Sequence, residues 1–382
     1  MRIPFNRPYL TGNELPYIQA ALESRLHCGN HTFGKRCAAF IEGLYGHKKV
    51  FLTPSCTAAM EMGAVLADLG PGDEVILPSW TFSSTANAIV LQGARPVFCE
   101  IDPATMNIDV KHIEALITPK TRMLAPIDYM GIPCDIDCIM QVARRHNLIV
   151  MEDAAQSTHS KYKGRWAGTT AHFSAHSFHE TKNFTCGEGG ALCLNDERFV
   201  ARAELLQEKG TDRSLVLKGV KNKYTWVDKG SSYLLADMLA AQLLAQFERA
   251  DEIVRLRGRV HEAYVELFTP FDTRGCLQIP KVPAHVTLNH HAFFVIFDTE
   301  EHQTQFLSRL REHDVSAYIG YLPLHSSEMG RRYGYTAGDL PITEAISKRI
   351  VRLPFYADMA HEGLDHCVSA MRTVLTGLYG QA

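Results

Sequence analysis

A lysine and an aspartate are the two side chains of this sequence whose types and surroundings best suit covalent chemistry. Lys182 lies in the segment 177–183, Ser-Phe-His-Glu-Thr-Lys-Asn, and glycines follow it closely at 187–190. Asp153 follows the apolar run 148–151 after one further acid. An amine can hold an aldehyde covalently, and a carboxylate can keep a pyridine nitrogen protonated. The pair therefore predicts pyridoxal phosphate as a cofactor.

Burial would prepare both side chains for this role. Lys182 must lose its proton before it can attack an aldehyde, and burial near a strand end lowers the pKa of a lysine. A buried acid is costly without a cationic partner, and a pyridinium nitrogen would be such a partner for Asp153. Gln156, which follows in the same segment, could then reach the phenolic oxygen of the cofactor ring.

Two further motifs lie where a predicted strand passes into a helix. Ser55, Cys56 and Thr57 follow one apolar run, and the free backbone amides of a helix start suit a phosphate. The same residues could equally be ordinary helix caps. Phe82 is favoured over Trp80 to stack on a planar ring, although either aromatic could belong to the core.

The elements that would position these residues alternate between short apolar runs and amphipathic stretches. Strands are predicted at 50–52, 74–77, 96–99, 122–125, 148–151 and 191–194, and helices at 58–69 and 86–91. Strands that are buried on both faces read as continuous apolar runs, which indicates an α/β fold with a mostly parallel sheet covered by helices. Ligands bind beyond the carboxyl ends of such strands, so the four motifs should converge there.

The second half of the chain shows a different order of elements. A long helix at 236–259 is predicted to connect two domains, a large one at 1–250 and a small α+β domain at 251–382. The small domain should contain strands at 291–297 and 315–319 and helices at 303–313 and 362–378.

Composition excludes several classes of function. The chain has 382 residues and a formal net charge of −3, which creates no field for nucleic acid or an anionic membrane. Without a signal peptide or membrane span it is expected to be cytoplasmic, with free thiols. Cys134 and Cys138 are spaced like half of a metal site, but no second pair follows, so no metal is predicted.

The chain resembles the pyridoxal-phosphate sugar aminotransferases of the DegT/DnrJ/EryC1/StrS type, which act on nucleotide-linked keto sugars. The resemblance covers nearly the whole chain and rests on motifs at 3–6, 70–75, 152–156, 177–183 and 353–356. It implies the type I fold of aspartate aminotransferase and L-glutamate as the amino donor. It also implies a homodimer with its active site at the subunit interface.

The resemblance assigns roles to the residues of the predicted cofactor site. By this likeness Lys182 holds the aldehyde, Asp153 pairs with the pyridine nitrogen, and Gln156 contacts the ring hydroxyl. Phe82 stacks on the ring. The implied phosphate ligands are Ser55, Cys56 through its backbone N–H, Thr57 and Ser177. Many relatives place an asparagine on the partner's phosphate where this chain has Leu234, so either a nearby serine replaces it or the contact is absent.

The implied substrate is a dTDP-linked 4-keto-6-deoxyhexose that is aminated at C4 for a surface polysaccharide. The galacto and gluco products differ only in the face of C4 that receives the proton. The diphosphate of the nucleotide sugar requires local cations, for which Arg213, Lys221 and Lys223 are candidates. Tyr321 and His325 resemble residues near the substrate pocket of relatives, or else they pack the small domain.

Three other classes of protein fit the sequence less well. A sugar 3-dehydratase of the same fold would carry histidine where Lys182 stands. A non-catalytic cofactor-binding regulator would be expected to have a nucleic-acid module, and no basic block suggests one. A nicotinamide dehydrogenase would need a G-x-G-x-x-G turn after its first strand, and the glycines at 187–190 have neither that spacing nor that position.

Overall fold

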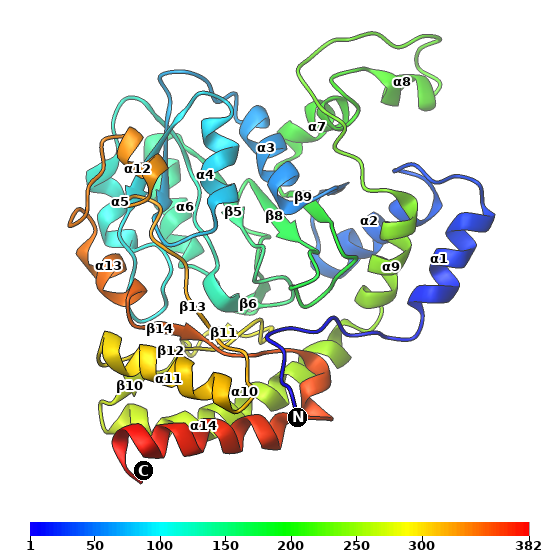
Figure 1. Cartoon of the computed structure of the whole chain (residues 1–382). Helices are drawn as coiled ribbons and strands as arrows, with labels where there is room; N and C mark the ends of the chain where they lie inside the picture. The colour runs from blue at the N-terminus through cyan, green and yellow to red at the C-terminus, as the bar shows by residue number, and fades with distance from the viewer. Residues whose placement is uncertain (382) are drawn as a thin grey trace.

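A seven-stranded sheet forms the centre of the larger part of the molecule (Figure 1). The structure is a computed structural model and describes residues 1–381. Its strands are β1 (Lys49–Thr53), β2 (Glu74–Pro78), β3 (Arg95–Cys99), β4 (Thr121–Leu124), β5 (Ile149–Asp153), β8 (Phe173–Ser177) and β9 (Gly190–Leu194). They lie in the order β1-β9-β8-β5-β4-β2-β3. Only β9 runs antiparallel to its neighbours β1 and β8, so the prediction of a mostly parallel sheet is confirmed.

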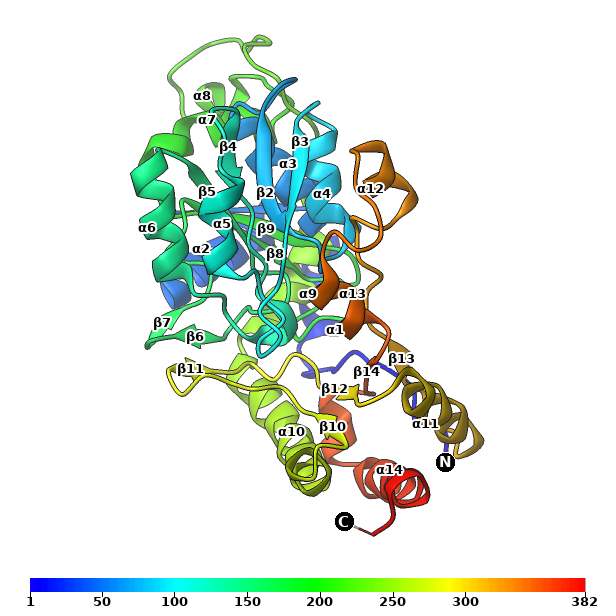
Figure 2. The same cartoon turned by 90° about the vertical axis from the view of Figure 1, so that its left-hand side faces the viewer.

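Helices cover both faces of this sheet (Figure 2). One face carries α3 (Cys56–Leu66), α4 (Ser83–Val90) and α7 (Val200–Gln207). The other face carries α1 (Glu14–Glu23), α2 (Thr32–Tyr45), α5 (Val110–Leu116), α6 (Ile136–His146) and α9 (Asp237–Phe247). Apolar side chains therefore point from both sides of each inner strand, which explains the continuous apolar runs of the sequence.

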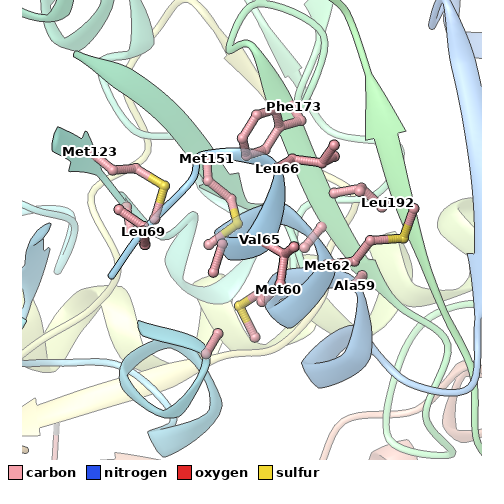
Figure 3. Close-up of a cluster of buried hydrophobic side chains, with 14 of the residues drawn as sticks. Ala59, Met60, Met62, Val65, Leu66, Leu69, Met123, Met151, Phe173 and Leu192 are labelled. Carbon is pink, nitrogen blue, oxygen red and sulfur yellow. The ribbon is translucent and has the colours of Figure 1, made fainter. Parts of the chain in front are cut away.

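Helix α3 is buried along most of its length. Figure 3 shows Met60, Met62 and Val65 of this helix among side chains of the neighbouring strands, including Met151 and Phe173. Such a helix, apolar on most of its sides, has to lie inside the domain, because it has no polar face to offer water. The first turn of α3 is thereby fixed in place against the sheet.

A second sheet and its helices form the smaller part of the molecule. The strands β10 (Leu277–Gln278), β12 (Phe294–Phe297), β14 (Ile350–Arg352) and β13 (Tyr318–Ile319) lie in that order. Against them pack α10 (Ala250–Thr273), α11 (Glu300–Glu312) and α14 (Leu364–Tyr379). Ile3 also belongs to this core and pairs with Val315, so the start of the chain packs with its end. We propose that the domain boundary lies near residue 250, where α10 begins.

The remaining elements are short. A three-stranded sheet is formed by β11 (Val286–Thr287), β6 (Lys161–Tyr162) and β7 (Arg165–Trp166). The short helices are α8 (Arg213–Leu217), α12 (Glu328–Arg332), α13 (Pro341–Ser347) and the 3-10 helices η1 (Tyr129–Gly131), η2 (Glu197–Phe199) and η3 (Ala357–Ala360). No helix within residues 1–381 is long and apolar enough to cross a membrane.

Two elements differ from the sequence-based prediction. The single helix predicted at 236–259 is wrong: α9 ends at Phe247, and Arg249 has non-helical backbone angles, φ −119° and ψ 23°, before α10 begins. Helix α9 buries its apolar side against α1 and α2, the first turn of α10 stays in that same core, and the later turns of α10, from Val260, pack against the smaller sheet. Strand β8, which ends before Lys182 as expected, had no predicted range, because Ser174 and His176 interrupt its apolar pattern.

A buried carboxylate completes the start of α2. The residue before this helix, His31, provides no side-chain cap. Instead, the two carboxylate oxygens of Asp237 accept hydrogen bonds from the backbone N–H groups of Phe33, at 3.0 Å, and Gly34, at 2.7 Å. Asp237 itself is completely buried. It therefore ties α2 to the first turn of α9 and satisfies amides that have no acceptor within their own helix.

Replacement of Asp237 by alanine should destabilise the protein. Asp237→Ala leaves two buried N–H groups without an acceptor, and we expect the free energy of unfolding to fall by about 2–3 kcal/mol. Urea unfolding followed by circular dichroism measures this change. Asp365→Ala, at an exposed position in the first turn of α14, is the matched control and should cost less than about 1 kcal/mol. Equal losses in the two variants would contradict the bridging role of Asp237.

Candidate active site

The predicted motifs meet at one edge of the large sheet. Strands β5 and β8 run parallel and end there with Asp153 and Ser177. Gly190, at the start of β9, pairs with Ser177 on one side and with Thr53 at the end of β1 on the other. A cavity of about 490 Å³ lies at this edge. All the predicted cofactor residues line it: Ser55, Cys56, Thr57, Phe82, Asp153, Gln156, Ser177 and Lys182.

Lys182 is presented to the cavity by the loop between β8 and β9. Backbone hydrogen bonds from Phe178 to Gly189, at 2.8 Å, and from Glu180 to Gly187, at 2.9 Å, close this loop. The amine of Lys182 has no ion-pair partner within residues 1–381. Burial lowers the pKa of this amine, and the negative charge of Asp153 offsets part of that effect. The loop therefore holds an amine that is more readily deprotonated than an exposed lysine.

Asp153 is the acid of the cavity. It is only 3% exposed, and burial raises the pKa of its carboxyl group. Hydrogen bonds from the hydroxyl of Thr85, at 2.7 Å, and from the backbone N–H of Ala155, at 3.2 Å, stabilise the ionised form. Within residues 1–381 no cationic side chain forms a salt bridge with it. A cationic nitrogen bound in the cavity would supply the missing partner.

The first turn of α3 forms another wall of the cavity. Ser55 caps the helix, because its hydroxyl accepts a hydrogen bond from the N–H of Ala58 at 3.1 Å. The amides of Cys56 and Thr57 belong to the helix start and have no intrahelical acceptor. Both expected roles of this segment therefore coexist: Ser55 is a cap, and the next amides remain available for an anion.

The other walls provide an aromatic ring and polar side chains. Phe82 is 58% exposed although it is a large apolar residue, whereas Trp80 is completely buried. An exposed ring on a cavity wall suits stacking on a planar ligand. The amide oxygen of Gln156 accepts a hydrogen bond from the N–H of Met130 at 2.7 Å, and its NH₂ group donates to the hydroxyl of Tyr321 at 3.3 Å.

His325 lies outside the cavity, in contrast to Tyr321, which lines it. One ring nitrogen of His325 lies 2.7 Å from the hydroxyl of Ser79, and the other lies 2.9 Å from a carboxylate oxygen of Glu344. The side chain is completely buried. In this structure His325 joins the segment before α12 to the end of β2, which is a packing role.

The predicted phosphate-binding cations also lie away from this cavity. Arg213, Lys221 and Lys223 belong to residues 208–232, which we call the projecting lobe and which carries α8 (Figure 1). Arg213 lies 3.6 Å from a carboxylate oxygen of Glu208. Lys221 pairs with Asp212 at 2.5 Å. Within the described residues, these cations do not line the cavity of their own chain.

Arg352 is a cavity residue that the sequence reasoning missed. It ends β14 and lines both the main cavity and an adjoining cavity of about 220 Å³ that also reaches Lys182. Its guanidinium donates to the carbonyl of Ile319 at 3.2 Å and lies 5.4 Å from the ring centre of Tyr321. Within residues 1–381 it forms no salt bridge. The only signal in the sequence was its position directly before the 353–356 motif.

The cavity fits pyridoxal phosphate in four respects. It offers an amine on Lys182, a carboxylate without a cationic partner on Asp153, an exposed ring on Phe82 and free amides at the start of α3. These groups match the aldehyde, the pyridine nitrogen, the ring face and the phosphate of that cofactor. They come from separate elements that the strand ends bring together.

Comparisons with known proteins agree with this chemistry. The model of the DegT/DnrJ/EryC1/StrS aminotransferase family matches residues 10–372. The chain is 32% identical over 398 aligned positions to the spore coat polysaccharide biosynthesis protein SpsC of Bacillus subtilis, and the match covers 98% of this chain and 97% of that protein.

Solved structures show the same relationship. The aminotransferase TlmJ from Streptoalloteichus hindustanus superposes with a TM-score of 0.89 at 28% identity, over 98% of this chain and 99% of that one. DesV from S. venezuelae gives a TM-score of 0.87 at 25% identity, over 97% and 98% of the two chains. The chain therefore belongs to the DegT/DnrJ/EryC1/StrS aminotransferase family, whose members use pyridoxal phosphate.

Proposed function

We propose that this sugar aminotransferase transfers the amino group of L-glutamate to C4 of a dTDP-linked 4-keto-6-deoxyhexose. The product would be dTDP-4-amino-4,6-dideoxygalactose, a precursor of a surface polysaccharide. The observation that carries the transaminase chemistry is the free amine of Lys182 in one cavity with the unpaired carboxylate of Asp153. The polysaccharide assignment is supported by the name of SpsC, a protein of spore coat polysaccharide biosynthesis.

Each cavity residue has a distinct task in this reaction. When bound, pyridoxal phosphate supplies an electrophilic aldehyde and a ring that accepts electrons. Asp153 holds positive charge at the pyridine nitrogen, Phe82 supports the ring face, and the amides that start α3 bind the phosphate. The amine of Lys182 removes the proton from the α-carbon of glutamate, and in the second half-reaction it delivers a proton to C4 of the sugar.

Arg352 is suited to a carboxylate of the amino donor. Its guanidinium is a cation without an acidic partner in the described part of the chain, and carboxylates bind such a group through two parallel hydrogen bonds. The adjoining cavity of about 220 Å³ suits a compact donor such as glutamate better than a nucleotide sugar. Arg352 would therefore orient the donor's α-carbon near Lys182.

The projecting lobe supports a homodimer. Leu217, Val220, Tyr224 and Trp226 of this lobe are between 58% and 78% exposed. Large apolar side chains gathered on one exposed segment mark an interaction surface. A second copy of the chain would cover them, and the lobe's Lys223 would then be available to the nucleotide diphosphate in the partner's site. In this arrangement the cations that lie far from their own cavity acquire a function.

Two further assignments remain as alternatives within this proposal. The gluco epimer, dTDP-4-amino-4,6-dideoxyglucose, or another nucleotide-linked keto sugar would use the same cavity chemistry. A sugar dehydratase or a non-catalytic cofactor-binding regulator is disfavoured, because Lys182 provides the amine that complete transamination requires.

Lys182→Ala should abolish transamination. The variant lacks the amine that holds the aldehyde and moves the proton, so we expect the rate to fall by at least about 10³-fold. The wild-type protein with added pyridoxal phosphate should absorb visible light, and borohydride should attach the cofactor permanently to the peptide that contains Lys182, as mass spectrometry will show. Lys111→Ala, at an exposed position in α5, is the control. A colourless wild-type protein would defeat the proposal.

Arg352→Ala and Lys223→Ala should affect different substrates. Arg352→Ala should raise the KM for glutamate by about 10²-fold, because it removes a charge-assisted pair worth about 3 kcal/mol. Lys223→Ala should raise the KM for the nucleotide sugar and leave glutamate nearly unchanged. Steady-state kinetics with each substrate varied separately measure both effects. Arg349→Ala, directly before β14, is the control for the first variant.

These assignments would be refuted if either variant changed the KM of the other substrate, or both KM values equally. The role of Lys182 would not be affected by that result. If Arg352→Ala loses turnover with glutamate and with the nucleotide sugar alike, its fold is damaged. Arg352→Lys should keep the fold intact.

The configuration of the product decides between the sugar alternatives. We expect the enzyme to place the new amino group in the galacto configuration at C4. NMR coupling constants of the purified product, formed from dTDP-4-keto-6-deoxyglucose and glutamate, measure this configuration. A gluco product would retain the transaminase proposal and replace the sugar assignment.

A further inference from the structure

Three side chains that commonly bind metals meet inside the large domain, apart from the active-site cavity. His47, His176 and Cys193 each offer one ligand atom, and these atoms lie within 4.8 Å of one another. The residues are 6%, 4% and 1% exposed. None of them lines the cavity that contains Lys182. His47 comes just before β1, and the other two lie in β8 and β9, so the cluster joins three neighbouring segments of the sheet.

The hydrogen bonds of His47 leave one of its nitrogens free. Its Nδ1 lies 2.8 Å from Oδ1 of Asn195. The NH₂ group of Asn195 donates to the carbonyls of Gly168, at 2.8 Å, and Ala171, at 2.9 Å, so Oδ1 must be the acceptor and Nδ1 of His47 carries the proton. Nε2 therefore presents a lone pair. It is buried and has no hydrogen-bond partner within residues 1–381.

This arrangement is the one that a metal-binding histidine requires. A ligating imidazole binds the metal through one nitrogen and donates the proton of the other to a fixed oxygen, which orients the ring. An unpartnered lone pair in a buried place is otherwise costly. The side-chain oxygen of Asn195 is thus positioned to orient the ring of His47 in this way.

His176 and Cys193 are placed to act with His47. Nδ1 of His176 lies 2.9 Å from the hydroxyl of Thr158, and its Nε2 lies 3.0 Å from the hydroxyl of Ser174, so the ring orientation is fixed from both sides. A neutral imidazole offers one nitrogen lone pair. Cys193 is 1% exposed, and a metal that binds its sulfur displaces the thiol proton.

We propose that His47, His176 and Cys193 bind a structural zinc ion. Two imidazole nitrogens and one thiolate are donors that zinc prefers, and the cluster contains no carboxylate that would favour a hard cation. Ligand atoms around tetrahedral zinc lie about 3.3–3.8 Å apart, so the cluster has to contract by about 1 Å. Ser174 Oγ lies 3.0 Å from Nε2 of His176, and a water molecule would fill the fourth position of the ion.

The surroundings of the cluster accommodate this ion. Gly168 packs closely against the cluster, because a Cβ at that position would lie 2.8 Å from Nε2 of His176 and 2.9 Å from Oγ of Ser174, so a larger residue there would block the site. Zinc binding forms a Zn–S bond and releases the thiol proton of Cys193 to solvent, which leaves one net positive charge. The carboxylate of Glu42 is close enough to act on both Cys193 and His47 and offsets that charge.

The ion would have a positioning role. His176 directly precedes Ser177 at the end of β8, and β9 carries Cys193 and begins with Gly190 at the cavity edge. A zinc ion would therefore fasten the two strands that hold the Lys182 loop, from the face of the sheet opposite α3. The site is closed to substrates, so it does not take part in the reaction itself.

Zinc loading of the full-length holoenzyme tests this proposal. The protein is treated with a chelator, dialysed against zinc sulfate and then against metal-free buffer, and its metal content is measured. We expect one zinc ion per chain in the wild type, and X-ray absorption at the zinc edge should show sulfur at about 2.3 Å and nitrogen at about 2.0–2.1 Å. The midpoint of thermal unfolding should rise when zinc is added.

Three variants locate the ion. Cys193→Ala should lose both the zinc and the sulfur signal, and His47→Gln should lose the zinc while it keeps a donor for Asn195. Cys37→Ala, which alters another buried cysteine of the same core, should bind zinc like the wild type. His47→Gln decides the question if Cys193→Ala does not fold.

Three outcomes would overturn the inference. These are a wild type that retains no zinc, bound zinc without a sulfur neighbour, and zinc retention that is equal in wild type, Cys193→Ala and His47→Gln. The measurements read out metal and ligand atoms directly, so they are independent of the transaminase activity and of the sugar that the enzyme uses.

Discussion

The close approach between the start of α3 and the strand β9 is the constraint on which the active site depends. A Cβ at Gly190 would lie 2.4 Å from the backbone nitrogen of Cys56, so only glycine allows this contact. Through it the free amides of the helix reach the level of Ser177 and Thr53, the strand partners of Gly190. The anion site and the Lys182 loop, which ends at the same glycine, thereby acquire fixed positions relative to each other.

Strand β5 shows how one sheet serves two purposes with adjacent acids. Asp153 faces the cavity, where hydrogen bonds from Thr85 and Ala155 stabilise its charge. Glu152 points to the other face, is completely enclosed, and has its pKa raised well above the usual range by burial and by the neighbouring carboxyl of Asp128. Alternation along a strand thus directs one acid to the cavity and its neighbour into the interior.

Site residues could be predicted from the sequence where their location depends on neighbouring residues, and could not where it depends on segments far away in the chain. Asp153 and the segment 55–57 follow continuous apolar runs, and Lys182 was expected at the end of the next strand, so their common location could be inferred from the rule for strand ends. The location of Arg352 could not be inferred in this way, because it depends on how the smaller sheet packs against the larger one. The cluster around His47 was equally hidden, since its members are far apart in sequence and only strand pairing brings them together.

Local patterns also failed where a helix had to change direction. The apolar stripe over 236–259 continues without interruption, yet the chain bends at Arg249. The first turn of α10 still belongs to the core of α9, and α10 joins the core of the smaller sheet only from Val260 onward. Periodicity reports which side of a helix is buried, and it carries no information about what that side is buried against.

The capping of α2 by Asp237 has a consequence for the order in which the chain folds on the ribosome. The acceptor for the amides of Phe33 and Gly34 lies more than two hundred residues later, at separations of 204 and 203. Strand β1 likewise pairs only with β9, which begins at Gly190. The first fifty residues therefore leave the exit tunnel without their partners and must wait until most of the large domain has been synthesised. At translation speeds of about 5–20 residues per second, that wait lasts on the order of ten seconds or more, during which the chain's first helices have no sheet to cover.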